Sequence, residues 1–427
     1  MSGLKKFLIG AGLFILLLTL AGWLLLGVYV FPGQESHSGQ TALVNGNFLT
    51  MAADTPHVVT DRALLIENGT IHGFVPSGEL PEQAERVDLQ GGWATPGLFD
   101  LHVHLGGVPM AEGYGVPAMI LEYARQFRNT RKKFLRYGVT SITSLGDMHP
   151  MTMNMRDRLR SGELAGPRLR VAGPTLTAPG GHPVSTIYRG RQRLIESAAR
   201  QLAHPDSARQ VVDNLVEDGV DLIKIIYTAG RNDTLPRMKY PVMEAIVDRA
   251  HRHGRKAVVH VDTRKDLADA IRAGADGVEH LAIGPGREAD SLLTAMAERE
   301  VVQVPTLAVM DSFMDEQRMD SVMSHFTRWL DHDIPIALGT DAGNIPAGES
   351  VYRELALYEE AGMSTYDALQ SATINAARHA GVADQLGSLE AGKKADIAVF
   401  RRHPLEQLGE LSAPAMVFKG GIRPLAE

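Results

Sequence analysis

The chain has 427 residues, of which 44% are apolar and 22% are charged, and its formal net charge is -7. This length suits one large domain and one smaller domain. The near-average composition excludes a disordered chain, a collagen-like chain and a polytopic membrane protein. Nucleic acid is not expected as a partner, because nucleic-acid binders usually carry a basic surface. The chain has no cysteine, which excludes disulfides, thiolate metal ligands and a cysteine nucleophile.

An uncharged apolar run, residues 7–31, lies near the start of the chain. It exceeds the roughly 20 residues that cross a bilayer and the apolar part of a cleaved signal peptide. Lys5 and Lys6 precede it, and the next Lys or Arg is Arg62. We therefore predict a single-pass transmembrane helix that contacts the lipid bilayer, with the rest of the chain outside the cytoplasm, which is the periplasm if the cell is Gram-negative. A long cleaved signal peptide is the alternative.

Short strand-like runs lie toward both ends of the chain. Asn-Gly pairs at 45–46 and 68–69 interrupt the N-terminal runs, and this dipeptide is a strong signal for a hairpin turn. Neither end holds enough strands for a stable sheet, so we expect the two ends to pair into one small β-sandwich. The expected strands are Ala42–Val44, Ala63–Glu67, Thr70–Phe74, Ala395–Phe400 and Ala415–Lys419.

Between the two ends, eight β-like runs alternate with helical patterns, which predicts an α/β fold with a (β/α)8 TIM barrel. The expected strands are Leu98–Leu105, Val139–Leu145, Arg168–Thr175, Asp221–Tyr227, Lys256–Val261, Gly277–Leu281, Val301–Ala308 and Ile334–Asp341. The expected domains are a cytoplasmic tip and transmembrane anchor (1–36), two parts of the sandwich (37–95 and 385–427) and the barrel (96–384).

Histidines gather at the ends of these strands. In the first strand, LFDLHVHL, the i, i+2 spacing places His102 and His104 on one face together with Asp100. The fifth strand ends with His260, and the sixth ends with His280. Strand alternation places Glu279 on the face opposite His280. Two neighbouring imidazoles are difficult to bury without a cation, and imidazole is a common zinc ligand.

Two further residues fit a metal site. Lys224 lies between isoleucines in DLIKIIY, on a strand expected to be buried on both faces. A buried ammonium is costly, so such a lysine is paired, deprotonated or chemically modified. In the eighth strand Asp341 shares a face with Ala337 and Gly339, which leaves room for a crowded site. Nitrogen and oxygen ligands without sulfur suit Zn²⁺, and also Mn²⁺, Co²⁺ or Fe²⁺.

The segments TPGLFDLHVH, DLIKI, AVVHV, GVEHL, GTDAG and GSLEAGKKADIAVF resemble the amidohydrolase superfamily of metal-dependent hydrolases. The resemblance implies two divalent ions, with zinc expected. It gives one of them to His102, His104 and Asp341 and the other to His260 and His280. It also implies a carboxylated Lys224 that bridges both ions.

A short spacing from His260 to His280 and the segment TAPGGHP after the third strand look like the prolidase and imidazolonepropionase-like branch. That branch often carries a GGHG-type loop, and here Pro183 stands where glycine is common. We expect His182 to contact a small-molecule substrate from above the barrel mouth. Tyr227 is a second expected substrate contact, although alternation turns it away from the face of Lys224.

The resemblance implies a hydrolase of amide bonds in dipeptides, N-acyl amino acids or cyclic amides. A hydroxide bridging the two metals would attack the carbonyl, and Asp341 would act as the catalytic proton carrier. Two alternatives stay open, since a fold does not fix a substrate. One is ester, lactone or phosphotriester hydrolysis at the same site, and the other is a non-catalytic, membrane-tethered binding protein. A homo-oligomer is also expected.

Overall fold

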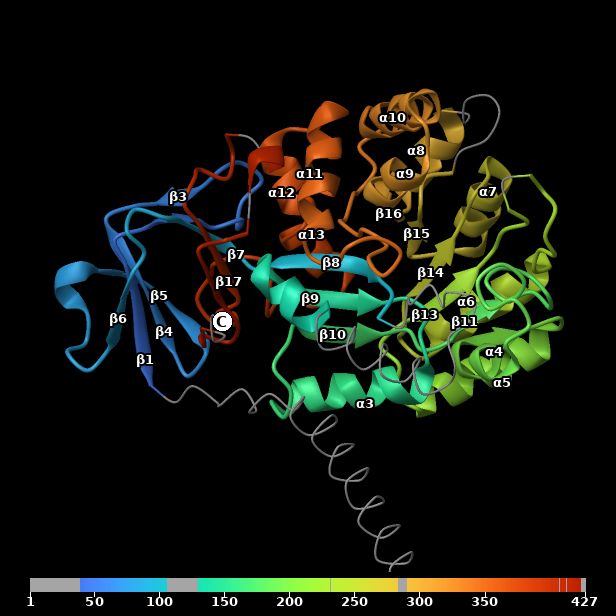
Figure 1. Cartoon of the computed structure of the whole chain (residues 1–427), viewed down its shortest axis with the longest axis horizontal. Coiled ribbons are helices and arrows are strands. Elements are labelled where there is room, and N and C mark those ends of the chain that lie inside the picture. Colours follow the sequence, from blue (N-terminus) through green and yellow to red (C-terminus); the bar gives the residue numbers. More distant parts are fainter. Residues whose placement is uncertain are drawn as a thin grey trace, which may run out of the picture.

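The structure is a computed structural model that describes residues 39–105, 130–230, 232–282, 290–406, 408–411 and 413–423. A β-sandwich lies beside a barrel of strands that is surrounded by helices (Figure 1). The chain enters the barrel from the sandwich and returns to the sandwich at its end. The expected barrel with an accompanying β domain is therefore present, whereas the exact domain boundaries stay a prediction.

The sandwich joins the two ends of the described chain. One sheet has the order β5-β4-β1-β6, and the other has the order β18-β17-β7-β2-β3. The first contains β1 (Gln40–Val44), β4 (Arg62–Glu67), β5 (Thr70–Pro76) and β6 (Glu85–Asp88). The second contains β2 (Asn47–Leu49), β3 (Val58–Val59), β7 (Trp93–Pro96), β17 (Ile397–Phe400) and β18 (Met416–Phe418). Leucine, isoleucine and phenylalanine side chains from both sheets form one buried core, so neither sheet is left with an exposed apolar face.

The barrel strands are parallel and form two sheets, with the orders β10-β9-β8 and β12-β11-β13-β14-β15-β16. Their bounds are β8 (Leu98–Val103), β9 (Val139–Ser144), β10 (Arg168–Val171), β11 (Thr175–Thr177), β12 (Ala199–Gln201), β13 (Ile223–Ile226), β14 (Ala257–His260), β15 (Gly277–Glu279) and β16 (Val302–Val304). Apolar residues of the strands and of the surrounding helices form the main core.

The third and seventh predicted strands have other bounds in the structure. The third is divided into β10, which pairs with β9, and β11, which pairs with β13. Gly173, at φ +75°, and Pro174 lie between the two parts and break the ladder. The seventh strand ends at Val304 instead of Ala308, because Pro305 follows and a helix begins at Leu307.

The eighth predicted strand closes the barrel without forming a regular strand. Its backbone lies between β16 and β8, with one bridge from Ile336 to Gln303 and another from Ala342 to Val103. Other groups compete for its hydrogen bonds: the N–H of Leu338 donates to the carbonyl of Ser371. The irregular segment still brings Asp341 to the end of β8, where the first-strand histidines lie.

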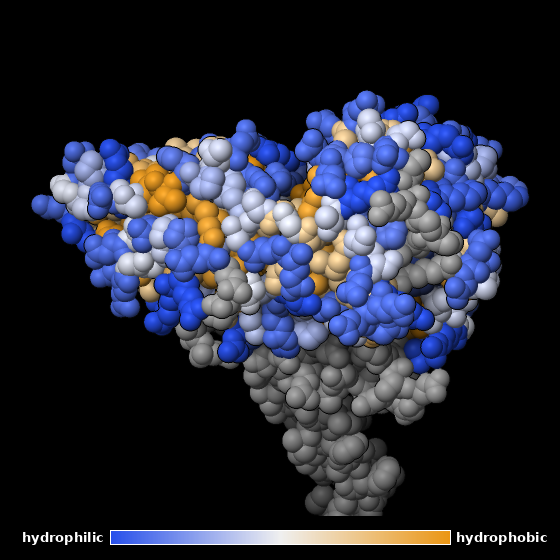
Figure 2. Space-filling view, turned by 90° about the horizontal axis from the view of Figure 1, so that it is seen from above, coloured by the Kyte–Doolittle hydropathy of each residue, from blue (hydrophilic) through white to orange (hydrophobic). Residues whose placement is uncertain are grey.

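Helices cover the outside of the barrel (Figure 1). They are α3 (His149–Arg160), α4 (Gln192–Ala198), α5 (Pro205–Glu217), α6 (Tyr240–Arg252), α7 (Arg264–Ala273), α8 (Asp290–Glu298), α9 (Leu307–Phe313), α10 (Glu316–Leu330), α11 (Ser350–Glu360), α12 (Thr365–Ser371) and α13 (Ile374–His379). Figure 2 shows that most of the visible face is hydrophilic and that its apolar residues gather toward the sandwich.

The sandwich and the barrel share a continuous stretch of backbone. Only Gly97 separates β7 from β8, and a Cβ at this position would meet the side-chain oxygen of Thr140 at 2.2 Å. Arg168 of β10 also donates two hydrogen bonds, of 2.7 and 2.8 Å, to the buried carboxylate of Asp396 beside β17. The two connections join β8 and β10 of the barrel to the sandwich.

The predicted localisation has to be corrected. None of the helices in the described ranges is long and apolar enough to cross a membrane. The longest of those helices, α10, has 15 residues, which corresponds to about 22 Å at 1.5 Å per residue and is shorter than a bilayer core of about 30 Å. The finding contradicts a single-pass membrane protein with its barrel outside the cytoplasm, and it gives no support to a lipid bilayer as a partner. The predicted span at residues 7–31 lies outside the described residues.

Candidate metal centre

Three of the predicted ligands meet at the C-terminal end of β8. One ligand atom from each of His102, His104 and Asp341 lies within 4.8 Å of the other two. Nε2 of His104 is 3.2 Å from Oδ1 of Asp341, and Nε2 of His102 is 3.8 Å from the same oxygen. Two imidazoles and a carboxylate at this spacing form a donor set that suits a divalent metal ion.

The irregular eighth segment sets the position of Asp341. Its N–H donates to the carbonyl of His102 at 2.8 Å, its φ is +61°, and its Oδ1 accepts a hydrogen bond from the side chain of Asn344 at 2.9 Å. Burial alone would raise the pKa of Asp341, but the electrostatic interaction with His102 and the hydrogen bonds from His104 and Asn344 outweigh burial and hold the pKa below its ordinary value. The carboxylate is therefore ionised at neutral pH.

Gly339 allows the irregular eighth segment to lie close to β8 and β16, so a larger residue at this position should destabilise the fold. A Cβ at this position would lie 2.5 Å from Cγ1 of Val304 and 2.9 Å from the backbone nitrogen of His102. We expect Gly339→Ala to lower the free energy of unfolding by about 1–3 kcal/mol, as overpacked cores do. Urea denaturation measures the change. The matched control is Gly78→Ala, since a Cβ at Gly78 meets nothing within 4 Å, and a loss of similar size there would contradict the steric explanation.

The histidines of β14 and β15 join the same cluster. The ring centroids of His260 and His280 are 4.4 Å apart, and those of His102 and His280 are 4.9 Å apart. Burial is the largest cause that lowers the pKa of both His102 and His280 well below the ordinary value. These imidazoles are therefore neutral, which is the form that binds a metal.

Oxygen atoms outside the cluster orient three of these rings. Nδ1 of His102 lies 2.6 Å from Oε2 of Glu279, and Nδ1 of His280 lies 2.7 Å from Oγ1 of Thr306. A longer contact of 3.4 Å joins Nε2 of His260 to Oδ2 of Asp262. When one ring nitrogen donates its proton in this way, the other nitrogen keeps the lone pair that a metal needs.

Glu279 departs from the sequence prediction. Strand alternation turned it away from His280, yet its carboxylate is 1% exposed and contacts His102 inside the barrel. The reason is local: β15 ends at Glu279, and His280 follows in the left-handed region at φ +66°. A two-residue repeat assumes extended backbone on both residues, so the prediction failed where the strand stopped. Sequence reasoning also missed Thr306 and Asp262 as partners of the histidines.

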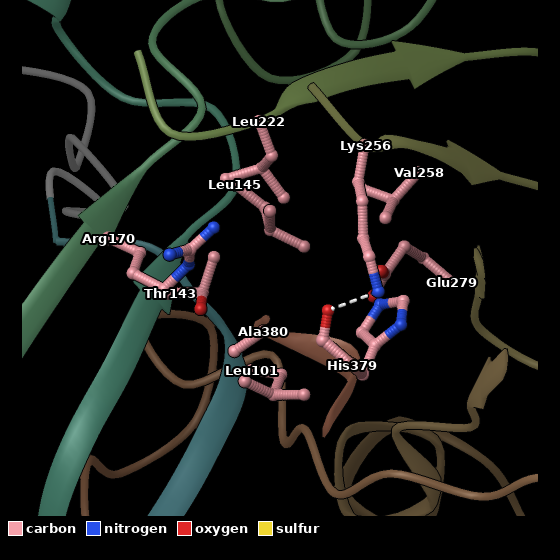
Figure 3. Close-up of a pocket in the computed structure, with 10 residues that line it drawn as sticks. All are labelled: Leu101, Thr143, Leu145, Arg170, Leu222, Lys256, Val258, Glu279, His379 and Ala380. Atoms are coloured by element: carbon pink, nitrogen blue, oxygen red, sulfur yellow. Dashed lines mark hydrogen bonds between the residues drawn. The ribbon is translucent and has the colours of Figure 1, made fainter. Parts of the chain in front are cut away.

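A small cavity lies beyond Glu279, toward the N-terminal ends of the strands. Its volume is about 20 Å³, which is enough for a water molecule. Lys256, Glu279 and His379 lie together at its wall (Figure 3), where the ammonium group of Lys256 donates to the carbonyl of His379 at 2.8 Å. The side chain of His379 is buried.

Lys224 differs from Lys256 because the structure gives its amine no hydrogen-bond partner in the ranges it describes. Its side chain is 1% exposed, and its Nζ has no hydrogen-bond partner among the described residues. Burial lowers the pKa of Lys224 to about 8, although the charges of Glu279 and Asp341 act in the opposite direction. An orphaned amine of reduced pKa inside the barrel fits a lysine that is chemically modified. This observation favours the carboxylated form that the resemblance implies.

The two expected substrate contacts have different positions. The His182 ring lies 5.3 Å from the His260 ring, and its Nδ1 is 2.7 Å from the hydroxyl of Thr186. Burial lowers the pKa of His182 to about 3, so the ring is neutral at the edge of the cluster.

In contrast, the structure does not bring Tyr227 to the site: its hydroxyl donates to Asp269 of α7 at 2.9 Å. Alternation along β13 accounts for this outward direction.

The comparisons with known proteins agree with this geometry. The Amidohydrolase family profile matches residues 93–423. The chain is 26% identical over 411 residues to an imidazolonepropionase of Cupriavidus necator, covering 87% of this chain and 91% of that protein. It is 22% identical over 362 residues to an ochratoxinase of Aspergillus niger, covering 76% and 74%. A solved Xaa-Pro dipeptidase with bound methionine in its active site is 25% identical, with a TM-score of 0.76, and covers 91% of this chain and 100% of that one.

These relatives are enzymes, and the matched region includes every predicted site residue. The comparisons confirm the resemblance to the prolidase and imidazolonepropionase-like branch and the prediction that the protein is an enzyme. The chain therefore belongs to the amidohydrolase family.

Proposed function

We propose that this protein is a metal-dependent hydrolase that cleaves amide bonds in small molecules. The observation that carries the proposal is the meeting of His102, His104 and Asp341 near the buried amine of Lys224, which has no hydrogen-bond partner in the described part of the chain. Dipeptides, N-acyl amino acids and cyclic amides are the substrate classes we favour. The similarity to an imidazolonepropionase and to a Xaa-Pro dipeptidase supports this choice.

The residues of the cluster divide into two metal sites in this proposal. His102, His104 and Asp341 would hold one divalent ion, and His260 and His280 would hold a second. Lys224 would bridge them after its neutral amine attacks CO₂ and loses a proton, which forms an N-carboxylate. When bound, two divalent ions such as Zn²⁺ lower the pKa of a water molecule and polarise a carbonyl group.

Asp341 would move the proton. Its carboxylate is ionised at neutral pH for the reasons given above, so it can accept a proton from the attacking water. The same oxygen can then deliver this proton to the leaving nitrogen, which cannot depart from an amide as an anion. Asn344 and His104 hold Oδ1 in place, so the side chain need not reorient between the two transfers.

His182 would contact the substrate in this proposal. Its neutral ring, beside His260, can exchange a hydrogen bond with a substrate carbonyl or amide without adding a charge to the site. A homo-oligomer stays a prediction alongside this proposal.

One experiment tests the proposed function. The metal content of the purified protein is measured by elemental analysis, and the protein is then assayed against dipeptides, acyl-amino acids, cyclic amides, esters, lactones and phosphotriesters. We expect about two divalent ions per chain and turnover of an amide substrate. Turnover of esters, lactones or phosphotriesters without turnover of any amide would contradict amide hydrolysis and support the alternative hydrolase function. A protein that takes up no metal under any loading condition would refute the proposal.

A further inference from the structure

A buried carboxylate on α11, Glu354, has no role in the cluster described so far. It is 0% exposed, and each of its two oxygens accepts a backbone N–H. Oε1 accepts from Leu307 at 2.8 Å, and Oε2 accepts from Ala308 at 2.6 Å. These two N–H groups open α9, so Glu354 satisfies donors that the first turn of a helix always leaves without a partner.

The residue that would ordinarily satisfy them is occupied elsewhere. Thr306 is at the N-cap position of α9, and threonine is a favoured N-cap residue, yet its side chain caps no N–H of this helix. Its Oγ1 lies instead 2.7 Å from Nδ1 of His280. Glu354, reaching across from another helix, provides the capping contacts that Thr306 does not.

The backbone around both residues needs this support. Thr306 has φ +52° and ψ +47°, and His280 has φ +66°, a left-handed conformation that is rare for a β-branched residue such as threonine. The N–H of His280 donates to the carbonyl of Val304 at 2.9 Å, and its own carbonyl accepts from Nε2 of Gln303 at 2.8 Å. The side chain of His280 thus depends on the segment that joins β16 to α9.

We propose that Glu354 is a positioning residue for His280. By holding the N–H groups of Leu307 and Ala308, it fixes the turn at Thr306 and so the hydroxyl that accepts the Nδ1–H of His280. The Nε2 lone pair of His280 is then available toward the other histidines. The inference rests on the proposed function, because it assigns His280 to a metal site.

The test compares three variants in metal-free protein and in metal titrations. Glu354→Gln replaces one accepting oxygen by an amide that cannot accept, and Thr306→Val removes the hydroxyl while keeping the shape. Glu359→Gln is the matched control: Glu359 also lies on α11 and accepts a backbone N–H, that of Leu408 at 2.9 Å, and Leu408 belongs to the short helix η2 (Leu408–Glu410) instead of α9. Histidine ¹⁵N chemical shifts report which ring nitrogen carries the proton.

In metal-free protein we expect Thr306→Val and Glu354→Gln to change the ¹⁵N signals of His280 in the same direction, and Glu359→Gln to leave them unchanged. In titrations we expect both variants to lower the affinity for the second of two bound metal ions by about 10–100-fold, a typical loss for residues that orient ligands. We expect the double variant, with both Thr306→Val and Glu354→Gln, to bind the second metal ion as tightly as the more affected single variant, because both residues act through the same contact.

Unchanged His280 signals and unchanged second-metal affinity in Glu354→Gln would overturn the inference. If that variant does not fold, Glu354→Asp, which keeps the carboxylate but shortens its reach, decides the same question. A parent protein that binds fewer than two metals would refute the two-metal centre instead. The metal-free spectra would still decide whether Glu354 orients His280, so the two failures are distinguishable.

Discussion

Asp341→Asn is expected to reduce the turnover of amide substrates by about 10²–10⁴-fold, the usual contribution of general acid–base catalysis. Asparagine keeps the shape of the side chain and one oxygen that can bind a metal, but it cannot carry a proton. The low pKa of Asp341 keeps the parent carboxylate ionised across the neutral range, so the loss should persist throughout that range. Activated esters should be less affected, because their leaving groups depart without a proton.

Steady-state kinetics on an amide and an activated ester, with metal content measured on the same samples, check this prediction. Asp276→Asn is the matched control. Its carboxylate accepts the N–H of Ala257 at 2.8 Å and precedes β15, at the opposite end of the strands from the cluster. A fully metal-loaded Asp341→Asn enzyme that hydrolyses amides within about tenfold of the parent rate would remove the proton-transfer role.

Lys224→Ala is expected to lose at least one metal ion and most of the activity. A residue that only orients a ligand contributes about 10–100-fold in metal affinity, and we expect the loss here to exceed that range because Lys224 would bind the metals itself. Formate or acetate added to the variant should restore part of the metal content and turnover, since a short carboxylate fits the space that the side chain vacates. Elemental analysis and turnover with and without these anions measure both effects.

Lys256→Ala serves as the control for removing a lysine from the barrel interior. The ammonium group of Lys256 already donates to the carbonyl of His379, so its loss should change stability without changing metal content. If Lys224→Ala retains both metals and normal turnover, Lys224 has no bridging role. If the two variants lose metal equally, the effect belongs to barrel packing and not to a modified lysine.

The sequence was informative where its residues obey simple periodic rules. The i, i+2 spacing of His102 and His104, together with the position of Asp341 after small residues, predicted side chains that do converge in the structure. The pairing of the two chain ends was also predicted, and Ile397 indeed lies opposite Pro96, although the other sheet of the sandwich consists of N-terminal strands alone. In both cases the evidence needed was present in the local sequence.

The remaining features depend on backbone conformations that periodic rules do not contain. Glu279 reaches His102 because His280 leaves the strand conformation, and alternation cannot predict that change. Thr306 contacts His280 from the turn that follows β16, a strand that ends early at Pro305. Glu354 lies on α11 and accepts a hydrogen bond from Leu307 of α9, 47 residues earlier in the chain. Such tertiary contacts carry no pattern in a single sequence. The membrane localisation rested on the apolar length of residues 7–31 and on the lysines that precede them, and the helices in the described ranges contradict it.

The direct passage from β7 through Gly97 into β8 also bears on how the chain folds during synthesis. β7 is completed by pairing with β17, a strand made about 300 residues later, and β8 is completed by the segment that ends at Ala342. The ribosome therefore releases His102 and His104 long before the residues that hold their strand in place exist. Contacts between such distant residues slow folding. His280 and Asp341 have to be made before the candidate metal centre can form, and until then β8 lacks one of its two neighbours.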